Sequence, residues 1–209
     1  MLLGGRTKPA IPTYYSRLYT RNLDSLQSEA DHYKKEGFTG MKLRCGYPMT
    51  EGWKGLKKNV EMVKTVRETV GDDVDIMLEA YMGFNYAYAR QLLKEMDPYN
   101  LRWAEELLLP DEIHNFARLK QSTSIPLSGG EHEYTRYGFH DLLQGGALDI
   151  FQFDTNRVGG FTEAQKICNM ALVHGVEVIP HGGQMHNLHV VMSSFASPMA
   201  EYFPQTEIE

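Results

Sequence analysis

The sequence predicts an α/β fold, specifically a (β/α)8 barrel of the TIM type. Eight short apolar or β-branched runs alternate with seven longer stretches of helical periodicity. Such alternation indicates parallel βαβ units, and eight strands with seven helices predict a barrel that lacks its last helix. A doubly wound sheet is the competing architecture, but its nucleotide-binding motifs, GxGxxG and GxxxxGK[ST], are absent from the sequence.

The predicted strands are short segments dominated by apolar, aromatic and β-branched residues. In chain order they are residues 12–19, 40–44, 74–81, 101–107, 125–130, 149–154, 176–180 and 199–203. Their regular pitch along the chain favours one repeating architecture over a series of unrelated modules.

The predicted helices fill the intervals between the strands and repeat apolar residues at steps of three and four. They are residues 23–35, 56–70, 86–96, 113–121, 137–143, 162–173 and 185–195. The face of the second helix, for example, carries Leu56, Val60, Val63 and Val66. Gly37, Gly71 and Gly175 each follow a helical run, where glycine suits a left-handed C-terminal cap.

Composition excludes several classes of protein. With 209 residues, 42% hydrophobic and 23% charged, the chain can bury the core of one domain. The net charge of −6 and the lack of a Lys/Arg-rich run argue against nucleic acid as a partner. No apolar run is long enough for a membrane span, so we expect no membrane partner. Two distant cysteines, Cys45 and Cys168, make a disulfide framework implausible and favour a cytoplasmic location.

Functional groups of a parallel barrel gather where the strands end. Those positions hold Arg44, Glu79, the pair Glu105 and Glu106, Glu131, Asp154, His181 and Glu201. Within this set Glu79, Glu105 and Glu131 follow one another at intervals of 26 residues, about one βα unit. Three converging carboxylates need a cation, and oxygen ligands favour Mg²⁺, then Mn²⁺, over zinc. The alternative is that surface glutamates fall at this spacing by chance.

Asp154 and His181 end neighbouring predicted strands. A carboxylate beside an imidazole sets its tautomer and raises its basicity, as a general base requires. The alternative is a structural histidine, and His132, His186 and His189 compete with His181 for the role.

Five segments resemble motifs of the enolase superfamily. Residues 102–107, R-W-A-E-E-L, resemble its W-x-E-E-P strand, and residues 154–160, D-T-N-R-V-G-G, resemble the D-x-N-R-x-G-G turn of the mandelate racemase subgroup. Residues 128–136, S-G-G-E-H-E-Y-T-R, are similar to the third ligand strand of the L-rhamnonate dehydratases in that subgroup. Residues 180–185 and 200–203 complete a match that has the right order and spacing.

The resemblance implies a role for each matching residue. The metal ligands would be Glu79, Glu105 and Glu131, the catalytic pair would be Asp154 and His181, and Glu201 would stabilise the enolate. Two positions depart from the family pattern. The first ligand is usually Asp and here is Glu79, which shifts the metal geometry, and Leu107 replaces the usual proline.

The chemistry that the family shares is removal of the proton next to a carboxylate, with a divalent cation stabilising the enediolate. Racemases of the subgroup carry a second base, the last lysine of a K-x-K strand, but this strand reads Lys42-Leu43-Arg44. Arginine stays protonated and is a poor base. We therefore expect a one-base dehydratase in which Arg44, Lys42 and His132 contact substrate. A barrel-interior salt bridge for Arg44 and a structural role for His132 remain as alternatives.

The resulting prediction is a lyase, a Mg²⁺-dependent hydro-lyase that converts an L-rhamnonate-like sugar acid to a 2-keto-3-deoxy sugar acid. Alternatives within the superfamily are a dehydratase for another acid sugar, a racemase or a cycloisomerase. A hydrolase and an inactive, truncated barrel that serves as a binding module are the alternatives from other classes. We expect residues 1–209 to form one enolase-type C-terminal catalytic barrel without the N-terminal capping domain of the family, and the full-length protein to be a homo-oligomer.

Overall fold

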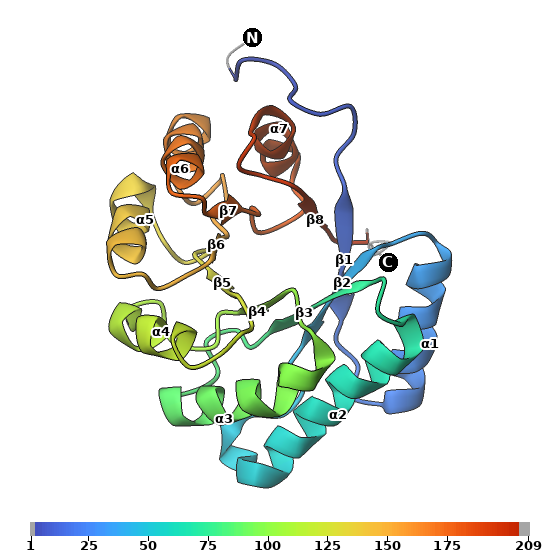
Figure 1. Ribbon diagram of the computed structural model, residues 1–209. Helices are drawn as coiled ribbons and strands as arrows, with labels where there is room; N and C mark the ends of the chain where they lie inside the picture. The colour runs from blue at the N-terminus through green and yellow to red at the C-terminus, as the bar shows by residue number, and fades with distance from the viewer. Residues whose placement is uncertain (1–2, 205–209) are drawn as a thin grey trace.

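A ring of parallel strands forms the centre of the molecule and helices surround it (Figure 1). The structure is a computed structural model that describes residues 3–204, so the predicted domain of residues 1–209 extends beyond it at both ends. The strands are β1 (Thr13–Leu18), β2 (Gly40–Arg44), β3 (Asp75–Glu79), β4 (Trp103–Glu105), β5 (Leu127–Gly129), β6 (Ile150–Phe151), β7 (Glu177–Val178) and β8 (Ala200–Tyr202). Each lies within a predicted segment, which confirms the predicted fold class.

The strands pair in parallel in the order β7-β6-β5-β4-β3-β2-β1-β8. No strand ladder joins β7 to β8 within residues 3–204, although Val178 N donates to Ala196 O across the gap at 2.9 Å. The register sets Arg44 opposite Glu79 and Glu79 opposite Glu105. Side chains from three neighbouring strands therefore end at the same level.

The helices follow the predicted segments closely. They are α1 (Leu23–Lys35), α2 (Gly52–Val70), α3 (Tyr86–Met96), α4 (Ile113–Lys120), α5 (Thr135–Gln144), α6 (Phe161–Val173) and α7 (Met185–Ser193), and short 3-10 turns span Met49–Glu51 and Asp97–Tyr99. The side chains of Asn22 and Asn85 accept hydrogen bonds from the first turns of α1 and α3. Gly71 ends α2 with a φ of 75° and a ψ of −172°, a conformation that glycine adopts readily but that is not the predicted left-handed helical cap.

Two regions differ from the prediction. The second helix begins at Gly52 rather than residue 56, because the 3-10 turn before it runs directly into the helix. The last strands are shorter than predicted, although the ladder continues past their ends. His181 N donates to Phe153 O at 2.9 Å, so the loops after β6 and β7 remain tied together.

Two layers of buried apolar side chains support the sheet. The smaller cluster, which lies inside the ring, consists of Tyr14, Met77, Trp103, Ile150 and Ile179. The rings of Tyr14 and Trp103 meet edge to face with centroids 5.3 Å apart. The larger cluster packs the outer faces of the strands against the helices. This filled interior leaves only the strand ends for chemistry.

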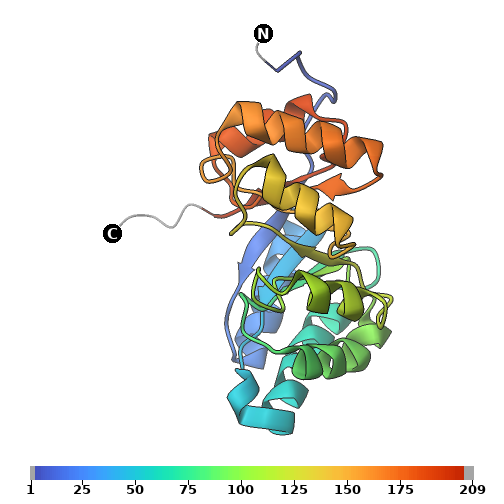
Figure 2. The same ribbon diagram turned by 90° about the vertical axis from the view of Figure 1, so that its left-hand side faces the viewer.

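The segment before β1 lies beside α7 (Figure 1, Figure 2). Thr7 N donates to Met192 O at 2.8 Å. The Lys8 ammonium donates to three backbone oxygens at the end of α7 and beyond it, those of Val191 (2.5 Å), Ser194 (2.9 Å) and Ser197 (2.9 Å). These bonds satisfy carbonyls that a helix end leaves without partners. None of the described helices is long and apolar enough to cross a membrane.

Replacing Lys8 with methionine should destabilise the protein, because three carbonyls lose a charged donor. We expect a loss of about 1–2 kcal/mol in the free energy of unfolding, measured by urea denaturation. Lys35→Met is the control, since Lys35 makes only an exposed pair with Asp31 on α1 and should change stability by less than about 0.5 kcal/mol. Equal effects of the two substitutions would contradict this role for Lys8.

Candidate active site

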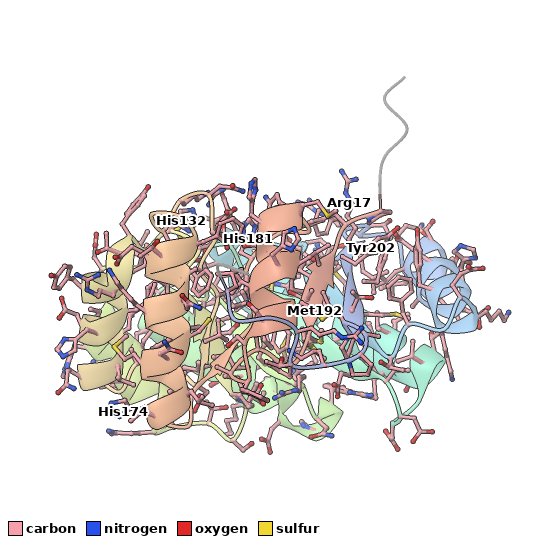
Figure 3. All side chains as sticks on the ribbon, turned by 90° about the horizontal axis from the view of Figure 1, so that it is seen from above. Arg17, His132, His174, His181, Met192 and Tyr202 are labelled. Atoms are coloured by element: carbon pink, nitrogen blue, oxygen red, sulfur yellow. The ribbon has the colours of Figure 1, made fainter. Side chains whose placement is uncertain are left out.

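The functional residues predicted from the sequence lie at one end of the barrel, because parallel strands share their C-terminal ends. Figure 3 shows His132 and His181 at this end and His174 at the other. The buried carboxylates here are Glu79, Glu105, Glu106, Glu131, Asp154 and Glu201. Such a concentration of buried acids is costly unless cations neutralise them.

Lys42 forms the floor of the site and is 2% exposed. Its ammonium lies 2.6 Å from Glu105 Oε1 and 2.7 Å from Glu201 Oε1. The remaining donors to these carboxylates are Ser16 and the Gly182 amide for Glu201, and Trp103 and Gln152 for Glu105. Every carboxylate oxygen on this floor therefore has a partner.

The pKa values follow from this arrangement. Burial alone would lower the pKa of Lys42, but Glu105 and Glu201 raise it well above its usual value, so the side chain stays charged. Burial raises the pKa of Glu105 to about 7, against the opposing effect of Lys42 and with the help of Glu79 and Glu201. Burial also acts on Glu201, but Lys42 and then His181 lower its pKa.

His181 lies between two carboxylates. Its Nε2 is 3.1 Å from Glu131 Oε2, and its Nδ1 is 3.4 Å from Asp154 Oδ2. Asn156 N donates to Asp154 Oδ1 at 2.8 Å and holds that carboxylate in place. The structure therefore brings together the predicted pair Asp154 and His181, and Glu131 lies beside them.

Arg44 and Glu79 form the opposite side of the site. Arg44 donates to Glu79 Oε1 at 2.8 Å, and its guanidinium lies 4.7 Å and 5.0 Å from the ring centroids of Tyr19 and Tyr81. Arg44 thus makes the salt bridge considered from the sequence while 39% of its side chain stays exposed to a ligand.

The loop after β3 holds a strained backbone beside these residues. Tyr81 and Met82 have φ values of 47° and 59°, and Glu106 has 45°. Left-handed conformations of such residues are uncommon and persist where surrounding contacts enforce them. Here Met82 N donates to Glu106 O at 2.6 Å and links the two strained segments.

The donor set fits a divalent cation. Glu106, Glu131 and His132 each place one possible ligand atom within 4.8 Å of the others. Of the predicted ligands, Glu131 belongs to this group, whereas the carboxylates of Glu79 and Glu105 are turned toward Arg44 and Lys42. A positive charge among these buried acids would offset the cost of burying like charges together. The ligand set Glu79, Glu105 and Glu131 stays a prediction.

Three residues of the site were not assigned a role from the sequence. Arg157 donates to Glu131 O at 3.2 Å, and Glu106 contacts His132 at 3.0 Å. Both lie inside recognised motifs, which was the available signal. Asn187 accepts from Thr155 N and donates to His181 O, at 3.0 Å and 2.5 Å, and so ties the loops of the catalytic pair. Nothing in the helical pattern around Asn187 marked it.

A parallel β/α barrel with buried carboxylates and an aspartate–histidine pair at its strand ends has the arrangement typical of a barrel enzyme. The family described as "Enolase C-terminal domain-like" matches residues 25–208. The chain belongs to this family.

Similar proteins extend this assignment. The L-rhamnonate dehydratase of Saccharopolyspora erythraea is 35% identical over 203 residues, which cover 96% of this chain and 50% of that protein. The crystal structure of rhamnonate dehydratase from Gibberella zeae complexed with Mg is also 35% identical, with a TM-score of 0.88. The match covers 98% of this chain and 48% of the chain in that structure. The crystal structure of the 3,6-anhydro-D-galactonate cycloisomerase from Zobellia galactanivorans is 30% identical with a TM-score of 0.88. The match covers 99% of this chain and 57% of the chain in that structure. The chain thus spans about half the length of these relatives.

The raised pKa of Glu105 predicts a pH dependence of stability in metal-free protein. The folded state holds this proton up to about pH 7, against a usual value of 4.5. The contribution is therefore complete below pH 4.5 and is lost as the pH rises through 7. We expect the wild type to lose stability relative to Glu105→Gln as the pH rises from 4.5 to 7. The measurement is the difference between their free energies of unfolding in EDTA, which should fall over this pH range.

Glu201→Gln is the matched control of opposite sign. Because the pKa of Glu201 is lowered, its contribution is present above its usual value and is lost as the pH falls. For each variant, the difference in free energy of unfolding from the wild type is plotted against pH. Slopes of the same sign in the two plots would contradict the charge distribution described above.

Proposed function

We propose that the protein is a Mg²⁺-dependent lyase that dehydrates a sugar acid, with L-rhamnonate as the first substrate to test. The observation that carries this proposal is the position of His181 between Asp154 and Glu131, at the ends of strands β5 to β7. The rhamnonate dehydratase relatives support the substrate class. Mn²⁺ would be the second choice of metal.

The cation would be held by Glu79, Glu105 and Glu131, the buried carboxylates at the ends of neighbouring strands. When bound, it would supply Lewis acidity to the substrate carboxylate. Lys42 and Arg44, which now contact Glu105 and Glu79, would contribute further positive charge around that carboxylate. Glu201 pairs with Lys42 on the floor of the site and would hold its ammonium group in position.

His181 would remove the proton from C2 of the acid, and Asp154, whose Oδ2 lies 3.4 Å from Nδ1, would orient the ring. The electron pair of the C2–H bond is first delocalised into the neighbouring carboxylate group, and it then forms a carbon–carbon double bond as the C3–O bond breaks. The leaving hydroxyl group takes the proton from His181 and departs as water. The resulting enol then becomes the 2-keto-3-deoxy acid, so the balance is one substrate to one product and one water.

Racemisation is the second candidate reaction, and one observation disfavours it. It needs a base on each face of the carbon, and the last position of the K-x-K strand, where racemases of the subgroup carry the second base, is Arg44. Its guanidinium is paired with Glu79 and stays protonated, so it cannot take a proton at ordinary pH.

Adding Mg²⁺ should raise the melting temperature, because an ion that binds only the folded state stabilises it by mass action. Glu105→Gln and Glu131→Gln should each abolish the shift, since each removes a proposed ligand. Glu61→Gln, at an exposed position of α2, is the control and should keep it. Retention of the shift in both site variants would place the ion elsewhere.

The substitution His181→Asn should stop both dehydration and exchange of the C2 hydrogen with deuterated solvent, while the Mg²⁺ shift survives. Asp154→Asn should keep weaker exchange, because the imidazole stays in place but loses its orienting charge. Loss of a positioned acid–base group costs about 10²–10⁴-fold, so NMR of the exchange separates the two variants. Normal exchange in His181→Asn would assign the proton transfer to another residue.

A further inference from the structure

Glu131 is flanked by two imidazoles, and each of these rings also faces a second carboxylate. His181 Nε2 lies 3.1 Å from one oxygen of Glu131, and His132 Nε2 lies 3.7 Å from the other. The Nδ1 atom of each ring faces a further carboxylate, Asp154 at 3.4 Å and Glu106 at 3.0 Å. The proposed reaction uses only the first of these two pairs.

Glu106 is an unusual residue in this second pair. It is 4% exposed and has a left-handed backbone with a φ of 45°. Its Oε1 contacts His132, whereas its Oε2 is buried and finds no hydrogen-bond partner in the part of the chain that the structure describes. A buried carboxylate oxygen without a donor costs free energy, which a function at this position would explain.

The His132 ring is held from a second side and remains accessible. The ring of Tyr81 meets it edge to face, with centroids 5.7 Å apart. The side chain of His132 is 27% exposed, so a ligand at the mouth of the barrel can reach it. Tyr81 also covers the Arg44 guanidinium, which places His132 on the same side of the site as Arg44.

The chemistry of the contact determines which nitrogen of His132 carries the proton. When Glu106 is ionised, its carboxylate only accepts hydrogen bonds, and Nδ1 of His132 is then the donor of the 3.0 Å contact. A neutral imidazole has a single N–H group, and Nε2 is then left with a free lone pair. Glu131 Oε1 lies 3.7 Å from Nε2, which is beyond hydrogen-bond distance. Within the part of the chain that the structure describes, Nε2 makes no hydrogen bond, so its lone pair is open to an O–H or N–H donor from a ligand.

We propose that Glu106 is a positioning residue, which fixes His132 in the Nδ1–H tautomer so that Nε2 accepts a hydrogen bond from a substrate hydroxyl group. The identity of the ligand rests on the proposed function, because a sugar acid carries hydroxyl groups beyond C2. The pair Glu106 and His132 then selects polyhydroxylated acids over short 2-hydroxy acids. A metal ion on Nε2 is the competing occupant, which the tests below distinguish.

The first test needs no substrate. Long-range ¹H–¹⁵N correlation spectra of protein labelled at histidine should show His132, assigned through His132→Gln, as the Nδ1–H tautomer at neutral pH. Glu106→Gln should disturb these signals, because an amide both donates and accepts. Glu112→Gln, which removes a carboxylate paired with Asn115 on α4, is the matched control and should not disturb them. An Nε2–H tautomer in the wild type would overturn the positioning role.

The second test measures binding in a His181→Asn background with Mg²⁺, where turnover is blocked. Glu106→Gln and His132→Gln should each weaken L-rhamnonate binding by about five- to tenfold. Combined, they should weaken it no further than His132→Gln alone, because the two residues act as a unit. Binding of 2-hydroxybutanoate, which lacks the further hydroxyl groups, should stay unchanged.

Three outcomes separate the proposal from its alternatives. Additive effects of the two substitutions, or equal losses for 2-hydroxybutanoate, would overturn the selection of hydroxyl groups. If L-rhamnonate does not bind the His181→Asn protein at all, the ligand assignment fails together with the proposed function, and the tautomer test still decides the role of Glu106. Electron spin echo spectra of the Mn²⁺-loaded wild type and of Mn²⁺-loaded His132→Gln should show the same nitrogen couplings. A coupling that is present in the wild type and absent in His132→Gln would make His132 a metal ligand instead.

Discussion

One buried ammonium group, that of Lys42, holds the floor of the site together. It pairs with Glu105 on β4 and Glu201 on β8, and these carboxylates also receive hydrogen bonds from Ser16 on β1 and from Gln152 beyond β6. Strands from both sides of the ring thus meet at a single charge. Loss of one partner from such a network leaves a buried charge uncompensated, which costs about 3–5 kcal/mol. This contact ties β2 to β4 and β8, the strands that surround the floor of the site.

Much of the fold was predictable because each part rests on local sequence. Apolar periodicity located all seven helices, and the two asparagine caps and Gly71 are residues whose preferences act within one turn. The lengths of β6 and β7 were not predictable, since the point where a ladder is interrupted depends on the neighbouring strand. The closure between β7 and β8 likewise depends on residues distant in sequence.

The site was predictable only in part, for the same reason. Spacing and motif order identified Asp154 and His181, and the structure brings them together. The pairing of Glu105 with Lys42 joins β4 to β2, two strands that are not neighbours in the sheet. Glu106 reaches His132 because its backbone is left-handed, a conformation that no neighbouring residue type signals. Local sequence does not encode such contacts.

Helix α7 contacts two regions that lie far apart in the sequence, the segment before β1 and the loops that carry the catalytic pair. Asn187, in its first turn, holds the His181 loop against Thr155, while Lys8 and Thr7 hold its last turn. The segment that precedes the first strand and the loops of the catalytic pair are therefore anchored to opposite ends of one nine-residue helix.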